Sequence, residues 1–181
     1  RIIATEIEHA ATVNTAKQLA ADGFDVVFLA PDATGHITPE VLSEALTEDT
    51  ILLSCQLVNN EIGTVQPVEQ LGKLLKAKAP KALFHIDAVQ GLCRVRLTPK
   101  KWNCDLMSVS GHKIGAPKGI GALYVKKGLR LPPLTFGGGQ ERGMRPGTEA
   151  VPNIAAFAKA CEIRMAHFDE DYAHVQELAD Y

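Results

Sequence analysis

The feature that most constrains the fold of this chain is a regular alternation between short apolar runs and amphipathic stretches. Stretches with helical periodicity cover residues 9–22, 39–46 and 67–79. Around them lie apolar, β-branched runs typical of strands: "RIIATEI", "DVVFLA", "TILLSCQLV", "ALFHID" and "DLMSVS". Strands that alternate with helices form βαβ units. The sequence therefore predicts an α/β fold with a mostly parallel sheet flanked by helices.

Local signals refine this prediction. Thr38 is the expected N-cap of the second helical stretch, with Pro39 at its first helical position, and Pro67 is expected to open the third. After "DLMSVS", the segments "GIGALYVKKG" and "LPPLTFGGG" predict a hairpin-like or antiparallel continuation followed by a glycine-rich loop.

Composition narrows the functional classes. The chain has 181 residues, 46% of them hydrophobic, which is enough for one main domain with a sizeable core. Nineteen basic and 21 acidic residues give a net charge of −2, so charge offers no case for binding nucleic acid or a membrane surface. The four cysteines form no CxxC pair, which favours buried thiols in a reducing compartment, and we expect a cytoplasmic protein.

Both ends favour a fragment of a longer protein, truncated on each side. Arg1 enters a strand-like run at once, and "FDEDYAHVQELADY" stops in a helical pattern without a glycine or proline. We expect residues 1–149 to belong to one α/β domain. Residues 150–181 should form a long helix that leads toward a C-terminal domain this chain does not contain.

Polar residues collect where the predicted strands end. Ligands bind at the carboxyl ends of the strands in open α/β sheets. The residues concerned are Glu8, His9, Asn59, Asn60, Glu61, Asp87, Gln90, Ser110, His112 and Lys113. Several strands are thus expected to direct donors and acceptors to one rim.

Asp87 and Lys113 each allow two readings. Spacing alone favours Asp87 as a cap of the following turn, but an acid at the end of an apolar strand could also meet a cationic partner. A loop lysine is usually a solvated charge, whereas a lysine in a dry cleft can lose its proton and act as a nucleophile or Schiff-base amine. The residues by themselves leave both questions open.

Other motifs are weaker. "GAPKGIG" is not GxxxxGK[ST] and precedes a strand-like run, so its glycines are interpreted as turn-formers. "HID" lacks a third ligand at a recognisable spacing, which predicts no metal site and a satisfied or solvated His85. No GxSxG elbow is present. In "FGGGQERGMRPGTEA", the glycines, Arg142, Arg145 and Thr148 fit either an anion site or a solvated turn.

Five motifs together resemble a known family. "TEIEHAA", "VNNEIGTVQP", "HIDAVQ", "SVSGHKIGAPKGIGALYV" and "GGGQERGMRPGTEAVPNIAAF" occur in the order and with roughly the spacing of the NifS/IscS-like cysteine desulfurases. These are pyridoxal-phosphate (PLP) enzymes of the class V aminotransferase superfamily, fold type I. The resemblance covers most of the chain. It implies that residues 1–149 are part of the PLP-binding large domain and that 150–181 lead toward the small domain.

The resemblance assigns the catalytic residues. Lys113 matches the lysine that holds PLP covalently and, once released, moves protons. Asp87 matches the carboxylate that faces the pyridine nitrogen and keeps the ring protonated. His9 matches the imidazole stacked on the ring, where it can act as an acid or base.

Further residues match cofactor ligands in that family. Gln90 resembles the donor to the phenolic oxygen of the ring, and Asn60 a second group near that oxygen and the substrate carboxylate. Ser110 and His112 resemble phosphate ligands. Thr148 resembles a phosphate ligand donated by a neighbouring subunit, which implies a homodimer.

The implied reaction converts L-cysteine to L-alanine and passes sulfur, as a persulfide, to acceptor or scaffold proteins for iron–sulfur clusters or related sulfur metabolism. In the family a loop of the type "SSGSAC" carries the attacking cysteine. None of Cys55, Cys93, Cys104 and Cys161 lies in such a loop, so the fragment is expected to be inactive alone. The alternatives are a selenocysteine lyase and a non-catalytic α/β domain fragment.

Overall fold

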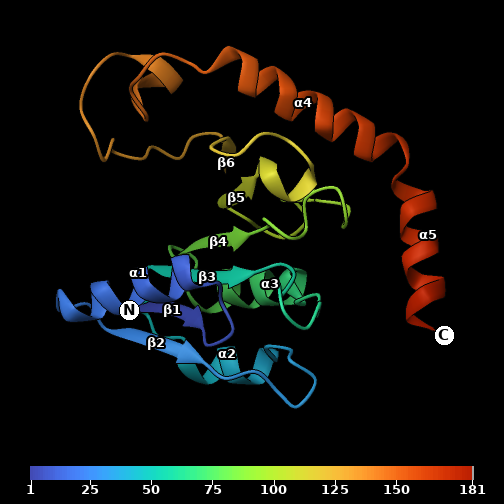
Figure 1. Cartoon of the computed structure of the whole chain (residues 1–181). Coiled ribbons are helices and arrows are strands. Elements are labelled where there is room, and N and C mark those ends of the chain that lie inside the picture. Colours follow the sequence, from blue (N-terminus) through green and yellow to red (C-terminus); the bar gives the residue numbers. More distant parts are fainter. Residues whose placement is uncertain (181) are drawn as a thin grey trace. The chain divides into compact units, whose positions relative to one another are not determined.

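The strands form one six-stranded sheet, described here from a computed structural model that covers residues 1–180. Its order is β2-β1-β3-β4-β5-β6 (Figure 1). The pairs β1–β2, β1–β3, β3–β4 and β4–β5 are all parallel. The strands span Ile2–Thr5, Val26–Leu29, Leu52–Gln56, Leu83–Asp87, Leu106–Ser110 and Gly121–Val125. The predicted α/β fold with a mostly parallel sheet is confirmed.

The chain divides into two compact units. The first contains residues 1–109 and 122–125, which include almost all of the sheet and the helices α1, α2 and α3. The second contains residues 110–121 and the chain from Lys126 onward.

In the first unit the strand order contains a switch point. From β1 the chain moves to β2 on one side, and then returns past β1 to β3, β4 and β5 on the other. Because parallel crossovers are right-handed, α1 (Ala10–Ala21) covers one face, whereas α2 (Pro39–Ala45) and α3 (Val68–Lys78) cover the other. The contact between α2 and α3 agrees with this arrangement. The switch point therefore lies between β1 and β3.

The core of this unit lies between the sheet and its helices. Ile3, Leu53 and Phe84 of the central strands are fully buried, as are Leu42 of α2 and Leu71 of α3. Each such side chain contributes about 1.5–3 kcal/mol relative to exposure. The middle of the sheet is thus a rigid support for the residues at its rim.

Helix boundaries follow the expected signals closely. The side chain of Thr38 accepts a hydrogen bond from the Val41 amide, and Pro39 opens α2, as predicted. The third helix begins at Val68, so Pro67 is its N-cap residue instead of its first helical residue.

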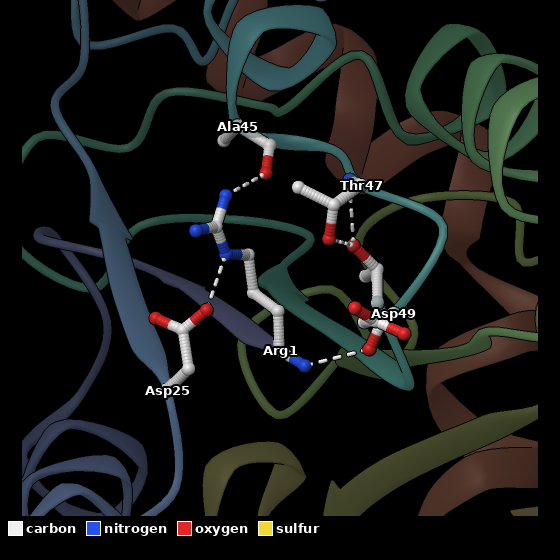
Figure 2. A network of polar contacts seen from close by, with 6 residues as sticks. Arg1, Asp25, Ala45, Thr47 and Asp49 are labelled. Carbon is white, nitrogen blue, oxygen red and sulfur yellow. Dashed lines mark hydrogen bonds and ion pairs between the residues drawn. The ribbon is translucent and has the colours of Figure 1, made fainter.

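At the amino ends of the strands, Arg1 joins three segments (Figure 2). Its guanidinium donates 2.8 Å hydrogen bonds to Asp25 Oδ2 and to the carbonyl of Ala45, and its backbone nitrogen lies 2.6 Å from the carbonyl oxygen of Asp49. These contacts connect β1 to the start of β2 and to the segment before β3. They are structural, which leaves the opposite rim of the sheet for function.

The second unit contains the helical end of the described chain. A 3₁₀ turn, η1 (Gly111–Ile114), contacts α4 (Val151–Ala166), which is followed by α5 (Phe168–Ala179). The long helix expected over residues 150–181 therefore begins at Val151 and is divided at His167. A second 3₁₀ turn, η2, spans Gln140–Gly143. No helix among residues 1–180 is long and apolar enough to cross a membrane.

Candidate functional site

The carboxyl ends of β1 and β3 meet through Glu8, at the switch point of the sheet. Thr5 Oγ1 and the Gln56 amide nitrogen donate hydrogen bonds of 2.8 and 2.7 Å to the same carboxyl oxygen, Glu8 Oε1. Thr5, Glu8 and Gln56 are all buried. Ligands bind at such switch points in open α/β sheets, so this junction marks the rim where a site is expected.

Two side chains at and just after the end of β3 also hold the segment that leads to His9. Gln56 Nε2 and Asn59 Nδ2 donate to the carbonyl oxygen of Ile7 at 2.6 and 3.0 Å. Asn59 Oδ1 in turn accepts from the amides of Glu61 and Ile62 and so shapes the loop that contains the exposed Asn60. Asn60 and His9 are thus carried by segments that are fixed to each other.

His9 is the N-cap residue of α1. Its Nδ1 accepts a 3.1 Å hydrogen bond from the Ala11 amide, and the side chain is exposed. Because Nδ1 is an acceptor, the neutral ring carries its proton on Nε2. The exposed edge of the imidazole is therefore a donor when neutral.

At the end of β4, Asp87 adopts the first of its two predicted roles. Its Oδ1 accepts a 2.9 Å hydrogen bond from the Val89 amide, so the carboxylate caps the following turn. In register, Asp87 lies opposite Gln56 of β3 and Ser108 of β5. Gln90 lies on the same turn, where its Oε1 is 3.3 Å from a guanidinium nitrogen of Arg94.

His85 lies in a row of polar side chains across three strands. Its Nδ1 is 2.8 Å from Ser54 Oγ of β3, and its Nε2 is 2.9 Å from Ser108 Oγ of β5. Burial lowers the pKa of this imidazole, while nearby Asp87 opposes the shift. The prediction of a satisfied His85 is confirmed. Within the described residues, no cluster of three His, Cys, Asp or Glu side chains could hold a metal ion.

Glu8 has the most perturbed carboxyl of the rim. Burial raises its pKa from an ordinary 4.5 to about 7, against the opposing effect of the hydrogen bonds from Thr5 and Gln56. The negative charge of Asp87 adds to the increase. A carboxyl with this pKa exchanges its proton near neutral pH.

In the second unit, Lys113 lies on the 3₁₀ turn η1 together with His112. Both side chains are exposed, and His112 Nδ1 is 2.8 Å from Ser110 Oγ. The turn ends at Gly115, whose φ of 92° lies in the left-handed region that favours glycine. Ser110, His112 and Lys113 therefore form one compact polar group.

Helix α4 supports this turn at Gly111. A Cβ atom there would lie 2.8 Å from Ile120 Cγ2 and 3.2 Å from Phe157 Cδ2, so only glycine fits without displacement. The Gly111 amide donates to the Ile120 carbonyl at 3.0 Å. Arg164 Nε of α4 lies 3.5 Å from the carbonyl oxygen of Ile114. The lysine is thus presented from a closely packed base.

Thr148 is exposed and lies between η2 and α4. The glycine-rich segment before it contains Glu141 and Arg142, both with positive φ, and Gln140 Oε1 accepts a 3.2 Å hydrogen bond from the Gly147 amide. These contacts shape the loop from within. That this loop binds an anion remains a prediction.

The expected site residues therefore fall into two groups. His9, Asn60, Asp87 and Gln90 follow strands of the first unit, whereas the lysine group and Thr148 belong to the second. Sequence reasoning did not single out three polar residues that organise the rim, namely the buried Gln56 and Ser54 and the partly buried Ser108. In "LLSCQLV" the polar residues Ser54 and Gln56 are two positions apart, and this spacing could have indicated a polar face of the strand.

Comparison with known proteins decides the family. The model of the class-V aminotransferases matches residues 1–181. The chain belongs to this family. It is 48% identical over 169 residues to cysteine desulfurase 2 of Trichormus variabilis, and 44% identical over 179 residues to cysteine desulfurase IscS of Methanosarcina thermophila. These alignments include 93% and 99% of this chain but 42% and 44% of those proteins.

Solved structures agree with this class-V aminotransferase assignment. A NifS-like protein superposes with a TM-score of 0.95 at 41% identity, covering 99% of this chain and 49% of that one. A structure described as SspA in complex with cysteine gives a TM-score of 0.85 at 42% identity, covering 89% of this chain and 46% of that one. The expected family and fold are thus confirmed. The chain spans less than half the length of the two curated relatives.

The polar groups of this chain fit the cofactor of the family. Class-V aminotransferases are PLP enzymes. PLP offers a ring nitrogen, a phenolic oxygen, an aldehyde and a phosphate. The chain provides a carboxylate at Asp87, an amide at Gln90, an amine at Lys113 and a hydroxyl–imidazole pair at Ser110 and His112. These groups match the parts of the cofactor in chemical kind, the carboxylate and amide in the first unit and the amine and the hydroxyl–imidazole pair in the second.

Proposed function

We propose that this chain is part of a PLP-dependent cysteine desulfurase, which converts L-cysteine to L-alanine and passes the sulfur on as a persulfide. The observation that carries the proposal is 42–48% identity to curated cysteine desulfurases over nearly the whole chain. The intact "SGHK" turn on its closely packed base supports it.

In this proposal the residues of the chain have distinct tasks. The bound cofactor supplies an acceptor for the electrons of the substrate carbon. Lys113 holds the cofactor and moves protons, and Asp87 keeps the ring nitrogen protonated. Gln90 and Asn60 bind the phenolic oxygen, with Asn60 also near the substrate carboxylate. Ser110 and His112 bind the phosphate.

His9 is proposed to stack on the ring and to act as an acid or base. The hydrogen bond from the Ala11 amide to Nδ1 supports this role, since it holds the ring orientation and leaves Nε2 for proton transfer. The orientation is set by the first turn of α1. The proton is thus placed on a defined atom.

The persulfide cysteine is proposed to be none of the four in this chain. Cys55 is fully buried, and burial raises the pKa of its thiol well above the ordinary range. Cys104 is also buried, whereas Cys93 and Cys161 are only partly buried and are set aside because neither lies in a loop of the "SSGSAC" type. A sulfur nucleophile must be an accessible thiolate. The four free thiols are instead consistent with a reducing compartment, and we propose a cytoplasmic location.

A homodimer and a sulfur-accepting protein partner complete the proposal. Thr148 is proposed to bind the phosphate of the neighbouring subunit. Two side chains of the preceding loop, Leu134 and Phe136, are 97% and 90% exposed, as expected for residues covered in an assembly.

A cofactor titration tests the proposed function. PLP added to the protein should give a lysine-dependent absorbance band in the visible range, and Lys113→Ala should abolish it. Lys118→Ala, which changes an exposed lysine five positions along, is the control and should keep the band. A band of equal strength in the Lys113→Ala variant would contradict the assignment of this lysine.

A further inference from the structure

Glu8 carries the one buried side-chain oxygen or nitrogen among residues 1–180 that lacks a hydrogen-bond partner, its Oε2. The residue is only 8% exposed. Its other oxygen, Oε1, accepts hydrogen bonds from both Thr5 and Gln56. A buried polar atom without a partner is costly and calls for a physical explanation.

The difference between the two carboxyl oxygens of Glu8 indicates which one carries the proton when the group is neutral. Since Oε1 already accepts two hydrogen bonds, a neutral carboxyl carries its hydrogen on Oε2. An ionised Glu8 would instead leave a buried negative oxygen without any donor, which is far more costly than a buried hydroxyl.

The groups around Glu8 also favour its neutral, protonated form. Among the described residues, the groups that act on its carboxyl are Thr5 of β1, Gln56 of β3 and Asp87 of β4, and Cys55 is its other titratable neighbour. None of these is a cation, and Asp87 repels a second negative charge. Ionisation of Glu8 therefore has no cation in this cluster to compensate it, only the two hydrogen bonds to Oε1.

His85 is the second buried titratable neighbour of Asp87, two residues earlier on the same face of β4. Both of its ring nitrogens have serine partners, and burial disfavours its charged form. Asp87 thus lies between two groups whose charged forms burial disfavours.

We propose that Glu8 is a positioning residue of the cofactor site: with its proton on Oε2 it joins β1 to β3 and leaves Asp87 as the charged carboxylate of the cluster. The inference rests on the proposed function. A negative charge at Asp87 matters there because it would hold the proton on the ring nitrogen of the cofactor. By joining the two strands, Glu8 also helps to fix the position of the segment from Ile7 to His9, because the Gln56 side chain donates a hydrogen bond to the Ile7 carbonyl.

Carbon-13 NMR of the protein with labelled glutamate carboxyls tests the protonation. The resonance lost in Glu8→Gln identifies Glu8, whose titration midpoint should lie near pH 7. Asp87→Asn should lower this midpoint, since it removes the repulsion. Glu6→Gln changes an exposed carboxyl two residues earlier and should leave the midpoint unchanged. A midpoint near the ordinary 4.5 would overturn the inference.

PLP added in a second titration separates the inference from the proposed function. A protonated ring nitrogen at Asp87 would partly neutralise this carboxylate, so the Glu8 midpoint should fall when PLP binds. If the midpoint lies near pH 7 and responds to Asp87→Asn but not to PLP, the placement of Glu8 stands and the proposed cofactor role of Asp87 fails.

Amide hydrogen exchange tests the joining role. Glu8→Ala removes the acceptor of the Gln56 amide, and exchange there should accelerate by about tenfold or more. Glu8→Gln keeps a carbonyl oxygen in place of Oε1 and should retain slow exchange. Equal protection of Gln56 in all three proteins would show that Glu8 does not join the strands. If Glu8→Ala does not fold, the Glu8→Gln titration and exchange still decide the proposal.

Discussion

At the scale of single residues, the rim of the sheet separates charged from uncharged groups. Glu8 and His85 are both titratable, and burial disfavours the charged form of each, although one is an acid and the other a base. Asp87 is only partly buried, in contrast to Glu8, and has the Val89 amide as a donor. A rim organised in this way presents one defined charge to a ligand.

The pH dependence of stability follows from Glu8. The folded protein binds this proton more tightly than the unfolded chain does, so the stabilisation is fully present below about pH 4.5 and is lost as the pH rises to about 7. The shift corresponds to roughly 3 kcal/mol. Urea unfolding of wild type and Glu8→Gln across this window should show the loss only in wild type. A parallel pH dependence in the two proteins would refute the assignment.

At the scale of elements, the lysine turn depends on its packing against α4. Gly111→Ala would force a Cβ atom against Ile120 and Phe157, at a cost of about 1–3 kcal/mol. The turn should shift, and the Lys113-dependent absorbance with PLP should weaken. Gly139→Ala is the matched control for stability, since no atom lies within 4 Å of the added Cβ and the φ of Gly139 is −84°.

A double variant identifies the cause of that loss. Phe157→Ala removes one of the three side chains that the new methyl group would meet, the other two being Ile120 and Ala116, so adding it to Gly111→Ala should recover part of the absorbance and of the stability. Purely additive effects would show that the backbone preference of Gly111, and not its packing, is what matters.

The capping of α2 gives an independent test of an element. Thr38→Ala removes the side-chain acceptor of the Val41 amide and should lower the free energy of unfolding by about 1 kcal/mol. Thr38→Ser keeps the hydroxyl and should retain most of the stability. Thermal unfolding measures both, and equal values for the alanine and serine variants would exclude a capping role.

Elements were predictable where local chemistry decides them. The strands and first three helices follow from periodicity, and Thr38 and Pro39 mark the start of α2. The break at His167 was not predictable, because helical residues continue on both sides without glycine or proline. Glu6 and Glu8 also look alike in "ATEIEH", yet Glu6 is exposed and Glu8 buried. The difference arises because β3 brings the Gln56 amide to Glu8, a contact 48 residues away in sequence.

At the scale of the whole molecule, the class-V aminotransferase fold explains why the site residues are spread along the chain. His9 and Lys113 are separated by four strands in sequence, and the lysine and the Asp87 carboxylate belong to different units. The sequence therefore predicted these residues through their family motifs, since no short-range spacing connects them. The roles of His9, Asp87 and Lys113 are proposals, and the PLP absorbance experiments test them.

Subunit complementation tests the proposed homodimer and the role of Thr148 together. Lys113→Ala and Thr148→Ala should each weaken PLP binding in their own homodimers. If Thr148 acts on the neighbouring subunit, a mixed dimer has one site with both residues intact and one site that lacks both. Mixing the two variants, with partial unfolding and refolding to exchange subunits, should then restore the absorbance band to about a quarter of the wild-type signal, because about half of the dimers are mixed.

The competing arrangements give different results in the same experiment. If Thr148 serves its own subunit, every site in the mixture lacks one residue, and the signal does not rise above the mean of the two variant homodimers. Sedimentation velocity of the wild type should show a dimer, and replacement of the exposed Leu134 and Phe136 by serine should shift it toward the monomer if this loop is covered in the assembly. A monomeric wild type that binds PLP with full Lys113-dependent absorbance would exclude a shared site, because each subunit would then hold every group that the cofactor needs.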